Sequence, residues 1–468
     1  MLLLEINKIL REDLSLRMQY NNILKMKNRI PKLIKDKRAL CDMFYVENIM
    51  KNKDSLFFSG TIFLIGAISV AVLNYLYHLF MGRMLGPSDY GILGSLFALI
   101  YIATYATTAF NLSVSKFSAE FNKDNYIFNN LIKKALLYVS VVGLFILLAY
   151  FIFVPYIASF LNINSYSWLF IVGIIAYLSL ISAVLTGALN GMQSFIWQNS
   201  SGFFSALTKF VFAVILVYIG FSVWGALIAV LMGTILGIII SCYPLSYIFK
   251  KRNVRTYKNN KISKNNFNKY KAIKYFFFVF VASIIPILLI TLDQVLVKHY
   301  FSSSDAGFYV AAGTIAKIIW FGSGFLVGPL FPKVVSLKSK GKDTSKLLFK
   351  ALAYTGALVA IGCIAYFIIP TFIVSMLYGQ QYLKIVPLIG LFAIAMGLFS
   401  MAQIFIIYNL AVERKGFLWI LITALILEIA GIYLFHNTLS DVIKIVFAVN
   451  FFVIISLLLY NKKEVFGA

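Results

Sequence analysis

The chain has 468 residues, of which 61% are hydrophobic and only 13% are charged, and its formal net charge is +25. Because soluble domains carry about 25% charged residues, this composition excludes a water-soluble globule. The apolar residues form long runs after Leu56, as in helical membrane proteins, whereas a transmembrane barrel would show short alternating segments. A positive net charge can indicate nucleic-acid binding, but these cations lie in loops between apolar runs, where they set membrane topology.

Residues 1–54 precede the first apolar run and carry both signs of charge, with an excess of Lys and Arg. We predict a basic cytosolic N-terminal extension here. Scattered leucines and isoleucines also allow short amphipathic helices at the membrane surface. Translation from Met50 is a third interpretation, because the polar residues after it suit the lead-in to a first membrane helix.

The first two apolar runs, Leu56–Met81 and Ile92–Leu112, flank a short segment that contains Gly86, Pro87 and Asp89. Each run is long enough to cross a bilayer at about 1.5 Å of rise per residue. Gly, Pro and Asp are the residues that a tight reversal needs. The pattern therefore predicts a transmembrane helical hairpin with a short tip.

The whole chain predicts an all-α, polytopic integral membrane protein with about twelve spans, each near the ~20 residues that a bilayer requires. The predicted spans are Leu56–Met81, Ile92–Leu112, Ala135–Ile157, Ser167–Leu189, Ser201–Gly220, Val223–Phe249, Tyr275–Phe301, Gly307–Leu330, Leu347–Ile369, Leu383–Asn409, Gly416–Phe435 and Val442–Tyr460.

The distribution of cations predicts the orientation of these spans. Ten Lys or Arg and no acid lie between residues 250 and 274, and further cations follow the second, eighth, tenth and last spans. The alternate loops 162–166, 220–222 and 371–382 contain no Lys or Arg. Since cytoplasmic loops are enriched in these residues, we expect both termini to be cytoplasmic in a multi-pass protein of the plasma membrane.

The basic loop divides the spans into two sets of six. Asp89-Tyr90-Gly91 recurs as Asp305-Ala306-Gly307 at the same place in the second set (305 − 89 = 216). Six spans are an even number, so the two sets have the same orientation and form a parallel repeat, with a central cavity expected between them. The predicted domains are the extension 1–54, an N-lobe 55–250, a basic cytosolic linker 251–274, a C-lobe 275–461 and a cytosolic tail 462–468.

The motifs of both repeats carry a family resemblance. The first is Arg83-Met84-Leu85-Gly86-Pro87 followed by Asp89-Tyr90-Gly91, and the second comprises Leu292-Asp293-Gln294, Asp305-Ala306-Gly307-Phe308-Tyr309, Lys317 and Phe331-Pro332-Lys333. These residues resemble the polysaccharide-exporter branch of the multidrug/oligosaccharidyl-lipid/polysaccharide flippase superfamily, which includes the O-antigen flippases. The resemblance covers about Leu56 to Tyr460. It implies twelve to fourteen helices in two lobes around a central cavity that opens alternately to each side.

Two lysines lie in the middle of predicted spans, Lys209 in the fifth and Lys317 in the eighth. An ionisable group in hydrocarbon costs from about 3 to over 10 kcal/mol, so each needs a reason. We predict that they bind the phosphate of an anionic lipid-linked sugar, with Arg83 as a further substrate contact. Asn74 is interpreted as an interhelical hydrogen-bonding residue or as a polar group of the cavity that contacts the sugar. Structural ion pairs or snorkelling side chains are the alternative for the lysines, and an interfacial anchor for Arg83.

Asp293 and Glu428 are the acids within predicted spans. They are candidates for H⁺ or Na⁺ coupling, because a buried carboxyl group suits ion exchange, and structural pairs with the lysines are the alternative. Lys298 is a possible partner of Asp293. His78 and His299 are interpreted as interfacial residues rather than proton switches.

We expect a flippase that moves a polyprenyl-phosphate-linked oligosaccharide to the outer leaflet for cell-surface glycan synthesis. A cation-coupled multidrug exporter of the same superfamily and, from another class, a membrane glycosyltransferase or polymerase are the alternatives. The sequence has no Gly-rich phosphate loop, nucleophile elbow or His/Cys cluster. No enzymatic activity, resident cofactor or metal is therefore expected. The expected partners are membrane lipids, the lipid-linked substrate and glycan-assembly enzymes, without nucleic acid.

Overall fold

A computed structural model describes residues 55–121, 125–249, 269–339, 343–462 and 464 of the chain. The predicted extension 1–54 lies outside these residues, as does most of the predicted linker 251–274. Contacts divide the chain into two units, Met1–Ile65 and Gly66–Ala468. All of the packing described below belongs to the second unit. We call its described parts before and after residue 260 the first half and the second half.

Every element of the described residues is a helix, which confirms the all-α prediction. The first half contains α5 (Ser55–Ala106), α6 (Thr108–Phe121), α7 (Asn125–Phe160), α8 (Tyr166–Gly191), α9 (Phe195–Leu216), the π-helical turn η1 (Val217–Phe221) and α10 (Ser222–Phe249). The second half contains α11 (Lys269–Leu288), α12 (Leu292–Tyr300), α13 (Ser303–Ser339), α14 (Ser345–Ile368), α15 (Pro370–Tyr378), the 3₁₀ turn η3 (Gln380–Ile385), α16 (Val386–Ala411), α17 (Phe417–Leu434) and α18 (Leu439–Tyr460).

The chain is a multi-pass membrane protein. Among the described residues, nine helical stretches are long and apolar enough to cross a membrane, or ten if a bent pair counts as one span. Two of the nine, Ile65–Ala119 and Phe195–Ser246, have 55 and 52 residues. As single straight helices they would be about 80 Å long, far beyond the ~30 Å of a hydrocarbon core. The count of twelve spans stays a prediction.

Both of these long stretches contain a glycine at which helical geometry is interrupted. Gly86 has φ 72° and ψ 174°, and Gly220 has φ 105° and ψ 7°. Only glycine adopts such backbone angles without a steric penalty, because it has no Cβ. Gly86 lies in the predicted tip of the first hairpin, so the sequence located this reversal correctly.

The predicted span Tyr275–Phe301 is broken in the structure. It consists of α11 and α12, which are bent by 44° at the break. Pro286 lacks the N–H that would bond to the preceding turn, which weakens the helix at this point. The hydroxyl of Thr291 also donates to the carbonyl of Ile287 at 2.6 Å, in place of a backbone N–H. Asp293 consequently lies in the first turn of a separate helix.

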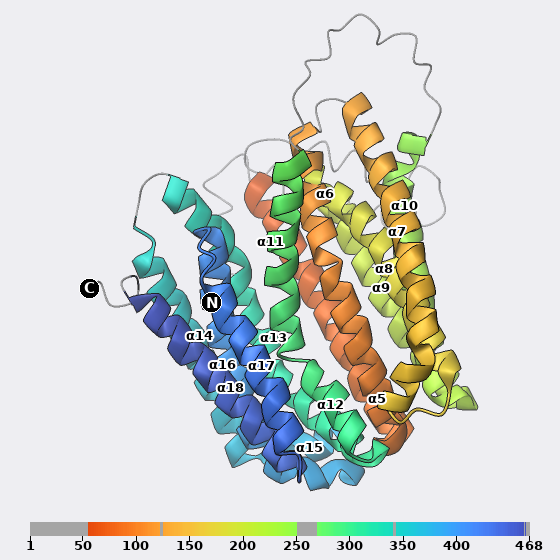
Figure 1. The fold of residues 1–468 in the computed structure, drawn as a ribbon, viewed down its shortest axis with the longest axis vertical. Coiled ribbons are helices and arrows are strands. Elements are labelled where there is room, and N and C mark those ends of the chain that lie inside the picture. The colour runs from red at the N-terminus through yellow and green to blue at the C-terminus, as the bar shows by residue number, and fades with distance from the viewer. Residues whose placement is uncertain (1–54, 122–124, 250–268, 340–342, 463, 465–468) are drawn as a thin grey trace, which may run out of the picture. The chain divides into compact units, whose positions relative to one another are not determined.

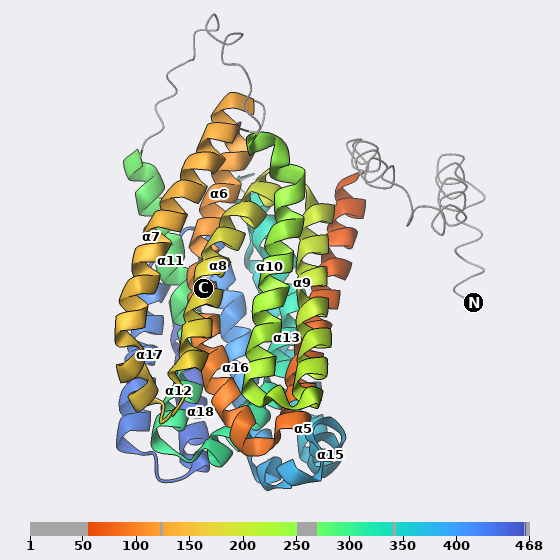
Figure 2. The same ribbon diagram turned by 90° about the vertical axis from the view of Figure 1, so that its right-hand side faces the viewer.

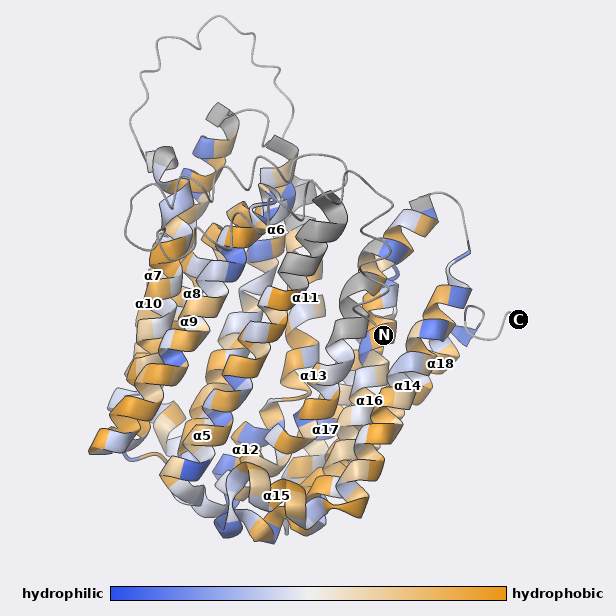
Figure 3. Ribbon diagram, turned by 180° about the vertical axis from the view of Figure 1, so that it is seen from behind, coloured by the Kyte–Doolittle hydropathy of each residue, from blue (hydrophilic) through white to orange (hydrophobic). Residues whose placement is uncertain are grey.

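The helices of each half pack with one another. In the first half α8 packs against α6, α7 and α10, and α9 packs against α10 (Figure 2). In the second half α16 packs against α13, α14 and α18 (Figure 1). Figure 3 shows hydrophobic residues in bands along α10 and α18. Exposed residues such as Phe145 and Phe153 on α7 suit contact with lipid.

The two halves meet where α6 packs against α11. They also meet at the end that carries Gly86, Gly220, α12 and α15, which we call the tip end. The opposite end, with the basic loops, is the loop end. The predicted tip loop 371–382 is not irregular, because α15 and part of η3 occupy it. Both α12 and α15 lie at the tip end in Figure 1.

Candidate functional site

Lys209, on α9, points toward α5 of the first half. Its Nζ donates a hydrogen bond to Oδ1 of Asn74 and lies 4.7 Å from the ring centroid of Tyr77 and 5.9 Å from that of Phe97. Among the described residues no carboxylate lies within 4.0 Å of this ammonium group. The charge is stabilised by an amide oxygen and by aromatic ring faces, so it is not neutralised.

Lys317, on α13, is 9% exposed. Within the described part of the chain it has no carboxylate partner inside 4.0 Å. It nevertheless interacts electrostatically with Asp293 and Glu428. Lys317 therefore differs from Lys209, because two acids of its own half partly balance its charge.

His78 lies one helical turn after Asn74 on α5. It interacts electrostatically with both Lys209 and Lys317. Its Nε2 lies 2.7 Å from the hydroxyl of Tyr101, while its Nδ1 is buried without a hydrogen-bond partner. Its ring also packs against those of Tyr77 and Phe97 on the same helix. The interpretation of His78 as an interfacial residue stays a prediction.

Asp293 and Glu428 are both buried, the first on α12 and the second on α17. Oδ2 of Asp293 accepts a hydrogen bond from the hydroxyl of Tyr309 at 2.7 Å, and Oδ1 accepts one from the N–H of Gln294 at 2.8 Å. The start of α12 also places this carboxylate at the positive end of a helix dipole. Oε1 of Glu428 has no hydrogen-bond partner. The two acids and Lys317 form one electrostatic cluster, contributed by three helices.

The predicted partner of Asp293, Lys298, bonds elsewhere. Its Nζ donates to the carbonyl of Leu161 at 2.7 Å and to that of Asn162 at 3.3 Å, both in the first half. The turn of α12 carries Lys298 away from Asp293, because five residues exceed the spacing of side chains on one helix face. Sequence reasoning missed this role, since nothing local to Lys298 indicates a carbonyl partner 137 residues away.

Arg83 lies at the tip end. Its Nε donates to the carbonyl of Leu377 at 2.8 Å, and its second guanidinium nitrogen donates to the carbonyl of Met376. While these bonds hold, Arg83 is not available to a substrate phosphate. Of the predicted substrate contacts, the structure brings Asn74 and Lys209 into contact, and it leaves Arg83 apart at the tip end.

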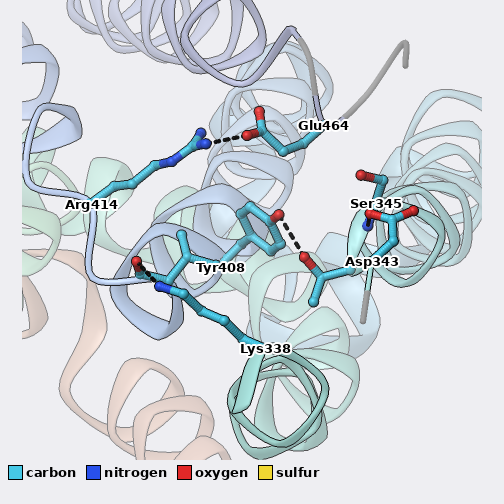
Figure 4. A pocket seen from close by; sticks show the side chains of 8 residues that line it. Lys338, Asp343, Ser345, Tyr408, Arg414 and Glu464 are labelled. Atoms are coloured by element: carbon cyan, nitrogen blue, oxygen red, sulfur yellow. Dashed lines mark hydrogen bonds and ion pairs between the residues drawn. The ribbon is translucent and has the colours of Figure 1, made fainter. Parts of the chain in front are cut away.

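A pocket of about 390 Å³ lies at the loop end of the second half (Figure 4). Arg414 and Glu464 form an ion pair there, and Lys338 donates to the carbonyl of Val412 at 2.5 Å. The N–H of Ser345 donates to the Asp343 carboxylate and lowers the pKa of that group. None of the predicted site residues lines this pocket. The charged groups of this pocket hold neighbouring loops together and therefore have a structural role.

No group of three or more His, Cys, Asp or Glu suitable for a metal ion occurs among the described residues. The candidate site is therefore a set of buried and partly buried ionisable groups. The first half contributes Lys209 and His78, and the second half contributes Lys317, Asp293 and Glu428. Such a set can bind an anion and exchange a small cation, and it holds no nucleophile paired with a base.

Comparison with solved structures identifies the fold. An inward-facing multidrug resistance MATE family transporter of the MOP superfamily is similar over 85% of this chain and 97% of that chain, with 14% identity and a TM-score of 0.68. The lipid II flippase MurJ in an inward closed conformation is similar over 86% and 87%, with 15% identity and a TM-score of 0.69. The eukaryotic MATE transporter AtDTX14 is similar over 86% and 93%, with 12% identity and a TM-score of 0.60.

These identities are low, so the likeness extends to the fold alone. No curated protein sequence matches the chain. A family model described as polysaccharide biosynthesis protein matches residues 57–338, which is more than half of the chain and includes both repeats of the hairpin motif. The chain therefore belongs to the polysaccharide biosynthesis protein family.

Proposed function

We propose that this protein is a flippase that moves a polyprenyl-phosphate-linked oligosaccharide from the cytoplasmic to the outer leaflet of the plasma membrane by alternating access. The observation that carries the proposal concerns two ammonium groups from different halves. Lys209 and Lys317 both interact electrostatically with His78 and have no carboxylate within 4.0 Å among the described residues. Two ammonium groups in a water-poor site attract a phosphate strongly, because charge-assisted hydrogen bonds are not screened there.

In this mechanism the phosphate and sugar pass between the halves while the prenyl tail stays in the bilayer. Asn74 holds the Lys209 ammonium in position, and no covalent chemistry on the sugar is required. We infer a transporter and not an enzyme. Both termini are proposed to be cytoplasmic, and the proposed partners are membrane lipids and glycan-assembly enzymes.

The lysines are tested by replacing each with methionine, which keeps the length of the side chain and removes its charge. Lys209→Met and Lys317→Met should each slow the flipping of a fluorescent lipid-linked oligosaccharide in proteoliposomes by about tenfold or more, since a hydrogen bond to a charged group contributes about 1.5–3 kcal/mol. Lys350→Met is the control, because Lys350 is an exposed lysine on α14. Unchanged rates in both lysine variants would remove the proposed cation role.

We propose further that Asp293 and Glu428 couple flipping to H⁺ or Na⁺. A phosphate bound to Lys317 neutralises the positive charge that otherwise stabilises the two carboxylates. Binding of a proton or Na⁺ at the acids and binding of the phosphate at the lysine should then strengthen each other, and this coupling is reciprocal. This coupling should be strongest at Glu428, because its Oε1 has no hydrogen-bond partner.

Glu428→Gln should therefore remove the dependence of the flipping rate on the Na⁺ or proton gradient and leave flipping without a gradient largely intact. The measurement is the rate in proteoliposomes with imposed Na⁺ or pH gradients. Asp305→Asn is the matched control, because Asp305 bonds to Ser302 in an exposed helix cap at the tip end. If Glu428→Gln responded to the gradients as the unchanged protein does, Glu428 would have no part in coupling.

A cation-coupled multidrug exporter is the second candidate, favoured by the buried acids Asp293 and Glu428. It would bind lipophilic cations at these acids, whereas the flippase would retain an anionic lipid. Mass spectrometry of the purified protein separates the two, because a co-purifying prenyl phosphate supports the flippase. A membrane glycosyltransferase or polymerase is disfavoured, because the acids Asp89, Asp305 and Asp441 at the tip end accept hydrogen bonds from Ser222, Ser302 and Thr438, as structural groups do.

A further inference from the structure

The first observation is a clasp between α5 and α15. The Arg83 guanidinium, near the end of the first span, donates to the carbonyls of Met376 and Leu377 at the C-terminal end of α15. The last carbonyls of a helix have no partner within the helix and carry partial negative charge. The cation of one half therefore caps a helix of the other half.

A second clasp has the same chemistry with the halves exchanged. Lys298, near the end of α12, donates to the carbonyls of Leu161 and Asn162 just beyond the C-terminal end of α7. Next to it, Nδ1 of His299 lies 2.6 Å from the carbonyl of Phe160, and the two rings stack at 4.0 Å. The side chain of Asn162 donates back to the carbonyl of His299 at 3.0 Å. Here a helix of the second half caps a helix of the first.

The repeat spacing found in the sequence relates these two clasps. His299 corresponds to Arg83, and Lys298 to Gly82, at the offset that separates the two hairpin motifs. Each clasp joins the end of the first span of one half to the connection between the third and fourth spans of the other. The pair therefore has an approximate two-fold relation.

Between the clasps the two glycine motifs touch each other. A Cβ on Gly91 would lie 2.0 Å from the carbonyl oxygen of Ser303, and one on Gly307 would lie 1.8 Å from the carbonyl oxygen of Pro87. Residues 87 and 303 have the same offset as residues 91 and 307, so the two contacts are reciprocal. These distances are far below any real Cβ contact, so only glycine permits this crossing of α5 and α13.

Buried tyrosines add hydrogen bonds at the same place. The hydroxyl of Tyr90 lies 3.0 Å from that of Tyr378, and the hydroxyl of Tyr382 donates to the carbonyl of Gly82 at 2.9 Å. Nearer the loop end the contact between the halves is apolar where α6 meets α11, with the rings of Phe110 and Phe276 at 4.8 Å. Closure at the tip end is therefore polar and directional.

We propose that the two carbonyl clasps and the glycine crossing form a two-fold-related gate that closes the tip end, and that both clasps must separate for the tip end to open. The proposal rests on the proposed function, because only a transporter that alternates between two openings needs such a gate. It assigns Arg83 and Lys298 to control of the conformational equilibrium.

The test measures the conformation directly and needs no substrate. Spin labels are attached at Ser88→Cys and Asn437→Cys, two exposed positions at the tip end of opposite halves, after Cys41, Cys242 and Cys363 are replaced by serine. Distances are measured by pulsed electron paramagnetic resonance in nanodiscs. Arg83→Met and Lys298→Met should each raise the population with a long distance several-fold, and the double variant should raise it further.

Lys338→Met is the matched control, since Lys338 also donates to a backbone carbonyl, that of Val412, but within one half. It should leave the distance distribution unchanged. Gly91→Ala and Gly307→Ala should shift the distribution to long distances by a different route, because the added methyl group prevents the close crossing. Gly322→Ala on α13 is their control, as no atom lies within 4 Å of a Cβ there.

The outcomes of these measurements distinguish a failure of the proposed gate from a failure of the proposed flippase function. A short distance in the Arg83, Lys298 and both glycine variants, with the proteins folded by thermal unfolding, would overturn the gate whatever the substrate is. A shift to long distances that Lys338→Met and Gly322→Ala do not share would establish it. If the shift occurred and the unchanged protein flipped no lipid-linked oligosaccharide in proteoliposomes, the proposed function would fail while the gate stood.

Discussion

The chemistry of the candidate site depends on which partners the partly buried Lys209 ammonium has. Lys209 has an amide oxygen and two ring faces around its ammonium group, but no carboxylate partner among the described residues. A salt bridge would satisfy the ammonium better and would leave nothing for a substrate. The neutral oxygen of Asn74 holds the charge in place and keeps it available. We interpret Asn74 as a residue that stabilises the Lys209 ammonium without neutralising it, so that the ammonium can still bind a substrate phosphate.

This interpretation predicts opposite effects of two substitutions at Asn74. Asn74→Asp should raise the melting temperature, since it supplies a carboxylate to a partly buried ammonium, and should lower the flipping rate by about tenfold by neutralising the phosphate contact. Asn74→Leu should lower the free energy of unfolding by about 1–3 kcal/mol, because the ammonium loses its acceptor. Thermal unfolding and proteoliposome assays on the same samples check both. A rise in flipping with Asn74→Asp would contradict the role assigned to Lys209.

At the scale of elements, the breaks in the helices position the functional groups. The break between α11 and α12 brings Asp293 to the start of a helix, where the dipole stabilises a carboxylate. The reversals at Gly86 and Gly220 turn single apolar stretches back on themselves. Glycine at these positions is needed for its backbone angles. At Gly91 and Gly307 it is needed for space.

Two glycines without close neighbours allow the effect of backbone angles on stability to be measured without a steric contribution. Gly220 has φ 105°, and no atom lies within 4 Å of a Cβ built on it; Gly322 has equal space in the helix α13. Gly220→Ala should lower the free energy of unfolding by about 1–2 kcal/mol through backbone strain alone. Gly322→Ala should raise it by up to about 1 kcal/mol, because alanine favours helix. Denaturant titration of the purified protein measures both, and equal signs would contradict the assignment of a reversal to Gly220.

At the scale of the whole chain, parallel repeats explain why two clasps exist. A tip-end contact made by the first half with the second has a counterpart made by the second with the first, as the predicted parallel repeat requires. The register of this repeat could be predicted from Asp89-Tyr90-Gly91 and Asp305-Ala306-Gly307 together with the number of predicted spans. That the two motifs touch each other could not, because it depends on how the halves pack.

The charge pattern makes the orientation of the chain testable. Single cysteines at Ser88 and Asn437, both at the tip end, should react with a membrane-impermeant maleimide in intact cells. A cysteine at Lys462, after the last span, should react only after the membrane is opened, because cations are retained on the cytoplasmic side. All three positions are exposed. Labelling of Lys462→Cys in intact cells would reverse the proposed topology and with it the direction of flipping.

The sequence by itself determined the fold class, the alternation of apolar spans with basic loops, the repeat and the reversal at Gly86. These properties are local or periodic, so composition and spacing carry them. Tertiary structure alone decided that Arg83 and Lys298 bond to carbonyls 294 and 137 residues away. It also decided that Lys317 interacts electrostatically with two acids and that His78 interacts electrostatically with both lysines. Backbone carbonyls have no residue signature, and a buried charge is satisfied by whichever group the packing of distant helices brings to it.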